Sequence, residues 1–156
     1  MEYMGKYICL DNRGYIVDYT DGPDEGKPVI KGIDLTSFKV DEPLEVSEEI
    51  ILAIDAVYTN TQAFDVDIKW VDFQYGQGSR IYLHTDNLEI HIGDISRIEE
   101  KFEAIHEVVA VLPENKVGIL FVEDIDDDII FKSQESIDAA KEKENGETHG
   151  NAEENP

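Results

Sequence analysis

The hydrophobic pattern of residues 80–123 predicts a hairpin, a helix and a further strand in close succession. Apolar and polar residues alternate over Arg80–His84 and again over Leu88–Ile92, as they do in strands that bury one face. The three residues between these runs, Thr85-Asp86-Asn87, are typical of a tight turn. The two runs therefore predict a β-hairpin.

A helix is predicted directly after this hairpin, over Ser96–Leu112. Ser96 and Glu99 have the spacing of a capping box, and Pro113 ends the helical pattern. One apolar stripe repeats between them at intervals of three and four residues, through Ile98, Phe102, Ile105, Val109 and Leu112. After a short polar turn, apolar residues at every second position predict another strand over Val117–Phe121.

The order and spacing of these elements resemble a known family. The hairpin contains Asp86-Asn87, Ile90 and Gly93, the helix contains Lys101, Ile105 and Leu112, and Gly118-Ile119-Leu120 opens the strand that follows. Taken together, these residues resemble the extracytoplasmic β domain of the bacterial cell-division proteins FtsQ and DivIB. The resemblance implies a non-enzymatic scaffold of the division machinery that is required for septum formation.

The rest of the chain divides into three segments. Residues 1–27 predict two strands and a loop, and they resemble the junction between the POTRA domain and the β domain of that family. Residues 28–133 resemble the β domain itself, and they include a first helix over Ser47–Thr59. Residues 134–156 lose all apolar periodicity, so we expect a disordered acidic tail.

These patterns favour an α+β fold. We expect one mostly antiparallel mixed sheet of consecutive hairpins, with the two helices packed on it, and not a doubly wound parallel sheet. Apolar residues alternate with polar ones from Phe64 to Trp70, which predicts a strand with Trp70 in the core.

Composition narrows the classes of partner. The 156 residues carry a net charge of -23, with 36 acidic and 13 basic side chains. A protein that binds nucleic acid needs a basic surface, so we expect no nucleic-acid partner.

The only cysteine, Cys9, permits no disulfide within the chain. No run approaches the roughly eighteen apolar residues of a membrane span. Members of the family have a membrane span and a POTRA domain before the β domain, so we expect a C-terminal fragment.

No catalytic motif is present, and we expect no cofactor and no catalytic residue. The alternative to a scaffold is a small extracellular metal-dependent binder or enzyme that uses His84 and His91. Both histidines fall on the polar face of the hairpin, and Glu89 could complete a zinc site with them. Because no motif anchors these histidines, solvated strand positions are the simpler interpretation, and we assign no metal ligands.

The last predicted strand is the candidate partner-binding site. It contains Ile129, Ile130, Phe131 and Lys132, and the polar tail follows it directly. A last strand is often an edge strand, whose free backbone groups can accept a strand from another protein. An edge strand should also tolerate proline, for example at Ile130.

The resemblance implies FtsB- or DivIC-like and FtsL-like coiled-coil partners. It also implies a place on the extracytoplasmic face of the cell membrane, at the division septum.

Overall fold

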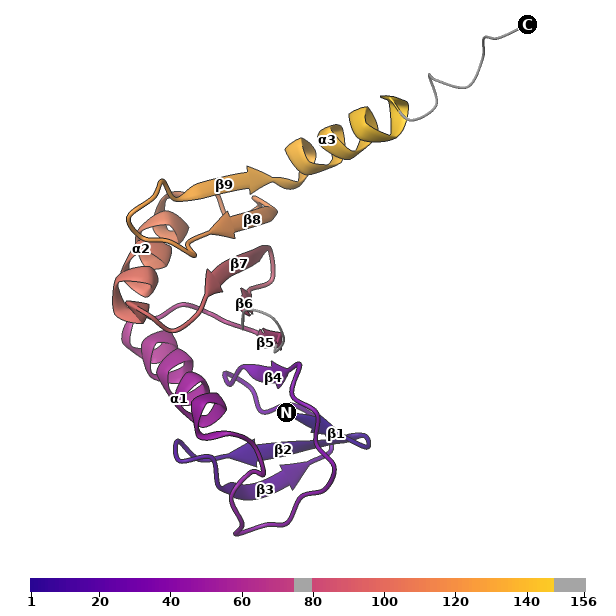
Figure 1. Cartoon of the computed structure of the whole chain (residues 1–156), viewed down its shortest axis with the longest axis vertical. Coiled ribbons are helices and arrows are strands. Elements are labelled where there is room, and N and C mark those ends of the chain that lie inside the picture. Colours follow the sequence, from indigo (N-terminus) through magenta and orange to yellow (C-terminus); the bar gives the residue numbers. More distant parts are fainter. Residues whose placement is uncertain (75–79, 148–156) are drawn as a thin grey trace, which may run out of the picture.

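The computed structural model describes residues 1–74 and 80–147, and it shows an α+β fold with two sheets. Strands β1 (Glu2–Tyr3), β2 (Lys6–Leu10) and β3 (Ile16–Thr20) form a small antiparallel sheet in that order. It lies at one end of the molecule, beside a larger sheet (Figure 1). The α+β class is confirmed, but the expectation of one sheet is corrected.

The larger sheet has six strands in chain order. They are β4 (Val29–Lys31), β5 (Trp70–Gln74), β6 (Arg80–His84), β7 (Leu88–Gly93), β8 (Gly118–Phe121) and β9 (Ile130–Ser133). Neighbouring strands are antiparallel except for β4 with β5 and β7 with β8. Each parallel pair is joined by a helix, α1 (Glu48–Ala63) or α2 (Ile98–Val111). Consecutive hairpins therefore describe only part of this sheet, because a helical crossover returns the chain in the same direction.

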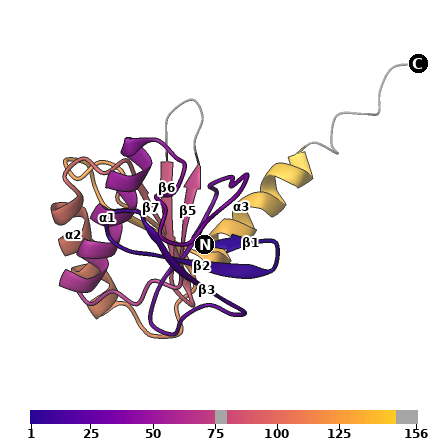
Figure 2. The same cartoon turned by 90° about the horizontal axis from the view of Figure 1, so that it is seen from below.

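Helices α1 and α2 cover one face of the six-stranded sheet, as both cartoon views show (Figures 1 and 2). Phe102 and Ile105 of α2 are fully buried against the sheet, as their place in the apolar stripe predicts. The helix begins at Ile98 and not at Ser96. The Ser96 hydroxyl bonds to the carboxylate of Asp94 instead, so the predicted capping box does not form.

The strand predicted from Phe64 begins only at Trp70. Val66 and Ile68 are buried as expected, but the backbone N–H of Ile68 donates to the carbonyl oxygen of Val66 at 2.8 Å. The alternation changes phase after this tight turn, between Ile68 and Val71. Val71 then lies in the core, whereas Trp70 lies on the opposite face of the sheet, which corrects its expected core position.

The acidic tail is helical over part of its length, which corrects the expectation of disorder for residues 134–147. Helix α3 (Gln134–Glu147) extends away from the body of the molecule (Figure 1). Ser133 caps it, since the Ser133 hydroxyl accepts the backbone N–H of Ser136 at 3.3 Å. Alanine, glutamate and lysine have high helix propensity, which acts without an apolar face. Residues 148–156 of the predicted tail lie outside the described residues.

Within residues 1–74 and 80–147, no helix combines the length and the apolar character that crossing a membrane requires.

Candidate functional site

Strand β9, which contains three of the four predicted partner-binding residues, lies at the edge of the six-stranded sheet. It pairs on one side with β8, where Ile130 lies opposite Phe121 and Lys132 lies opposite Ile119. In the part of the chain that the structure describes, no strand pairs with its other side. Ile129, the fourth predicted residue, immediately precedes the strand and is partly exposed.

The backbone hydrogen bonds define which amides of β9 face outward. The N–H of Gln134, just after the strand, donates to the carbonyl oxygen of Val117 at 2.9 Å. Since N–H groups alternate in direction along a strand, those of Ile130 and Lys132 also face β8. Those of Phe131 and Ser133 face away from the sheet. Each outward amide is a hydrogen-bond donor at the position where a partner strand would add.

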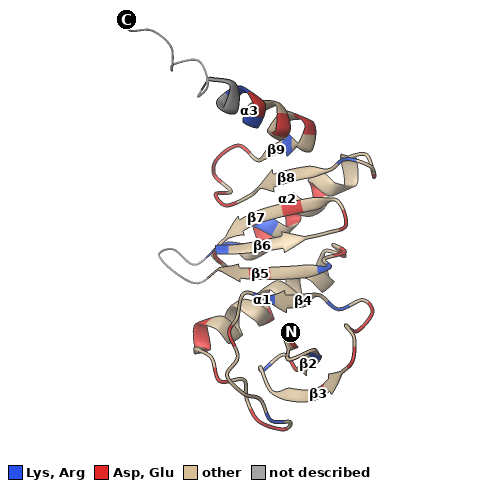
Figure 3. Ribbon diagram, turned by 90° about the vertical axis from the view of Figure 1, so that its right-hand side faces the viewer, with Lys and Arg blue, Asp and Glu red and all other residues tan. Residues whose placement is uncertain are grey.

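The side chains of β9 alternate as the sequence predicts. Phe131 packs against the core, whereas Ile130 and Lys132 lie on the opposite, uncovered face of the sheet. Ile130 is 47% exposed, a large value for an isoleucine inside a strand. The edge therefore continues without a break into an open sheet face, which Figure 3 shows with no helix in front of it.

Aromatic and histidine side chains are stacked along this open face. The rings of Trp70 and His84 lie opposite each other on β5 and β6, with centroids 4.6 Å apart and planes only 12° apart. The ammonium group of Lys31, on β4, lies 4.5 Å from the centre of the Trp70 ring. Burial lowers the pKa of the half-buried His84, with Glu89 acting in the opposite direction.

A second group of rings lies nearer to the edge. The imidazole of His91 contacts the rings of Tyr82 and Phe121 edge to face, at centroid distances of 4.6 and 4.7 Å. Its Nε2 lies 2.5 Å from Oε1 of Glu89. The ammonium group of Lys132 lies 5.0 Å from the centre of the Phe121 ring. These contacts connect the open face to the side chains of β9.

Strand register does not place the two histidines of the metal alternative directly opposite each other. His84 lies opposite Glu89 and His91 lies opposite Tyr82, while Trp70 covers one side of the His84 ring. No group of three His, Cys, Asp or Glu side chains within the described ranges is placed to hold a metal ion. The predicted face for both histidines is correct, but these contacts assign them to an aromatic assembly.

The open face has a different charge balance from the rest of the chain. By strand register it carries three basic side chains, those of Lys31, Arg80 and Lys132, and two acidic ones, those of Asp72 and Glu89. The whole chain has 36 acidic and only 13 basic residues. In Figure 3 the strands are mostly tan, and much of the red lies in helices and loops. This face is therefore a surface where an acidic or neutral protein segment meets little repulsion.

Comparison with protein-family models finds no match, and comparisons with curated proteins and with solved structures find none either.

Proposed function

We propose that this protein is a non-enzymatic binding module that accepts a strand from a partner protein along the outer edge of β9. The observation that carries the proposal is the position of β9 at the end of the sheet, with the amides of Phe131 and Ser133 directed outward. Backbone hydrogen bonds to these groups would give affinity, and the exposed side chains of Ile130 and Lys132 would select the partner.

The sequence resemblance to FtsQ and DivIB supports a more specific form of the proposal. Several of the shared residues hold the hairpin, α2 and β8 together. The Asn87 amide donates to the carbonyl oxygen of Glu114 at 2.7 Å, and the Lys101 ammonium donates to that of Ile92 at 2.8 Å. A side chain at Gly118 would collide with the backbone of Lys132. The shared residues thus build the platform on which β9 lies.

In this specific form, the partners are FtsB- or DivIC-like and FtsL-like coiled-coil proteins. The domain holds them on the extracytoplasmic side of the bacterial membrane at the division septum. Coiled-coil partners of this kind have little catalytic chemistry and need a persistent docking surface. A sheet edge supported by five further strands provides one.

A matched pair of substitutions at Ser133 tests strand addition. Ser133→Pro removes an outward N–H, whereas Ser133→Ala keeps it; both remove the hydroxyl that caps α3. We expect both variants to fold, because an edge strand tolerates proline and Lys132 before it is already extended. Calorimetry with the DivIC- or FtsB-like protein of the same genome should show about tenfold or greater weakening for Ser133→Pro only.

Ile130→Pro serves as the internal control. The structure revises the expectation that proline is tolerated at this position. The N–H of Ile130 faces β8, so proline there removes a bond within the sheet and should destabilise the fold. Equal binding by Ser133→Pro and Ser133→Ala, with both folded, would exclude a partner strand along β9.

A further inference from the structure

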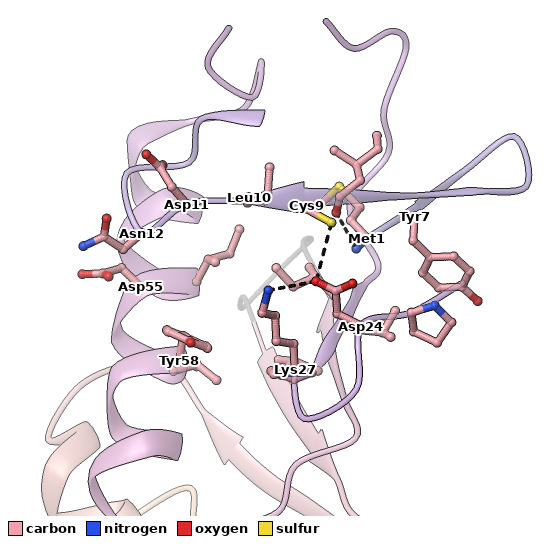
Figure 4. A pocket seen from close by; sticks show the side chains of 18 of the residues that line it. Met1, Tyr7, Cys9, Leu10, Asp11, Asn12, Asp24, Lys27, Asp55 and Tyr58 are labelled. Atoms are coloured by element: carbon pink, nitrogen blue, oxygen red, sulfur yellow. Dashed lines mark hydrogen bonds and ion pairs between the residues drawn. The ribbon is translucent and has the colours of Figure 1, made fainter. Parts of the chain in front are cut away.

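A cavity of about 300 Å³ lies where the small sheet meets the six-stranded sheet. Its walls come from β2, β4, β5, α1 and the segment 23–28 (Figure 4). Protein interiors contain few voids larger than a water molecule, whereas small-molecule sites begin at about this volume. No residue of β9 lines the cavity, so binding here is independent of strand addition along that edge.

The accessible part of the cavity wall is mainly apolar and comes from three elements. Ile54 and Tyr58 lie one turn apart on α1, so they share a face of the helix. Ile30 on β4 lies opposite the buried Val71 and therefore on the face of the sheet that the helices cover. Cys9 adds to the wall from β2. The fold leaves Cys9, Ile30, Ile54 and Tyr58 incompletely buried, so a ligand can cover apolar surface there.

Two groups that can carry positive charge line the cavity, and each already has a partner. The Nζ of Lys27 lies 2.8 Å from Oδ2 of Asp24, and Figure 4 shows this pair between β2 and α1. The amino group of Met1 donates to the carbonyl oxygen of Ile8 at 3.2 Å. Burial lowers the pKa of that amino group, which favours its uncharged form. An anion would therefore meet no free cation in the described part of the lining.

Three carboxylates also line the cavity, and two of them are already bound within the protein. Asp24 is the partner of Lys27, and Asp11 accepts two backbone N–H groups from its own turn. Asp55 lies about 100° round α1 from Ile54, and Figure 4 shows its carboxylate well apart from Lys27. A cation among the apolar side chains would therefore lose water without gaining a free counter-charge.

We propose that this cavity binds a compact neutral molecule of one or two rings, with its apolar body against Ile30, Ile54 and Tyr58. An apolar cavity of about 150 Å³ in another protein accepts benzene, so about twice that volume suits a ligand of this size. The ligand is neutral because the charged groups of the lining are paired with each other, bound to the backbone or turned away from the apolar wall.

The single cysteine makes occupancy measurable, because Cys9 lines the cavity. We expect phenethyl alcohol to slow the alkylation of Cys9 by neutral iodoacetamide in a saturable manner. Phenethylammonium and phenylacetate carry the same ring with opposite charges. Each should require about tenfold higher concentration for the same protection, because neither finds a free counter-charge. Equal or better protection by either ion would overturn the neutral class of ligand.

A matched pair of tryptophan substitutions on α1 tests the site. Ile54→Trp fills the cavity, whereas Leu52→Trp adds the same side chain at a position that is 56% exposed and outside the lining. The ratio of alkylation rates without and with phenethyl alcohol is measured for each variant. Protection should be lost in Ile54→Trp and kept in Leu52→Trp. An equal effect of the two substitutions, or no protection of the wild-type protein at millimolar probe, would overturn the site.

Chemical-shift changes in the wild-type protein locate the ligand without any substitution. Phenethyl alcohol should shift the signals of Ile30, Ile54 and Tyr58 in a saturable manner. This measurement decides the outcome even if Ile54→Trp does not fold. Shifts confined to another part of the protein would overturn the proposal.

Discussion

At the residue scale, the stacked pair of Trp70 and His84 gives the open face a pH dependence. Burial lowers the pKa of His84, so the fold favours its neutral form. Protonation is then easier in the unfolded chain, where the pKa is about 6.5. The resulting contribution to stability is complete above that value and is lost as pH falls toward the lower pKa of the folded state.

This predicts that the wild-type protein loses more stability than His84→Gln between about pH 7.5 and about pH 5. Urea unfolding at both pH values measures the difference, with His106→Gln as a control at an exposed histidine. The emission of Trp70, the only tryptophan, should report the same titration because protonated imidazole quenches a stacked indole. Identical pH dependence in wild type and His84→Gln would contradict this interpretation.

Lys101 connects α2 to the end of the hairpin of β6 and β7. Its side chain is 2% exposed, and its ammonium group donates to the carbonyl oxygens of Ile92 and Asp94 at 2.8 and 3.0 Å. Lys101→Met keeps most of the volume but leaves both carbonyls without this donor. We expect a loss of roughly 2–4 kcal/mol in the free energy of unfolding.

Lys116→Met is the control for this change, because Lys116 is exposed and its side chain makes no hydrogen bond to the described residues. It should shift the unfolding free energy by no more than about 0.5 kcal/mol. A similar small effect for Lys101→Met in chemical denaturation would mean that the ammonium group adds nothing to the fold.

Sequence predicted the burial of individual residues unevenly. Phe102 and Ile105 are buried because a helical stripe depends only on local spacing. Trp70 was assigned to the wrong face because the period-two pattern changes phase between Ile68 and Val71. The burial of Lys101 was not predicted, since nothing in its spacing distinguishes it from a surface lysine.

At the scale of elements, the contact between β8 and β9 depends on Gly118. A Cβ atom built there would lie 2.3 Å from the carbonyl oxygen of Lys132 and 2.8 Å from the ring of Phe131. Gly118→Ala should therefore push β9 away from β8 and cost roughly 1–3 kcal/mol. Gly22→Ala provides the control, as no atom lies within 4 Å of its Cβ position.

Thermal unfolding and partner binding should both respond to Gly118→Ala and neither to Gly22→Ala. Unchanged unfolding in Gly118→Ala would show that β9 accommodates the methyl group. Unchanged partner binding in a destabilised Gly118→Ala would argue against β9 as the docking strand.

The elements of the central unit were predicted closely, and the longer-range pairings were not. The hairpin of β6 and β7, the helix α2 and the strand β8 all lie within two residues of their predicted ranges. The parallel pairing of β4 with β5 joins residues about forty apart, and local periodicity contains no information on it. Helix α3 was missed because its residues favour a helix by propensity alone.

At the scale of the whole molecule, the two faces of the larger sheet differ in helix cover and in charge. One face is covered by α1 and α2, which build the core. Among the described residues the other face is open, rich in aromatic side chains and poor in net negative charge, and it ends at the outer edge of β9.

The alternation of amide directions in β9 provides the most direct test of strand addition. Residue-resolved hydrogen exchange would be measured by NMR, with and without the proposed DivIC- or FtsB-like partner. In the free protein the amides of Ile130 and Lys132, which face β8, should exchange slowly, and those of Phe131 and Ser133 should exchange faster. Binding should slow the exchange of Phe131 and Ser133. Binding that leaves these two amides unprotected, and protects another surface instead, would contradict the account.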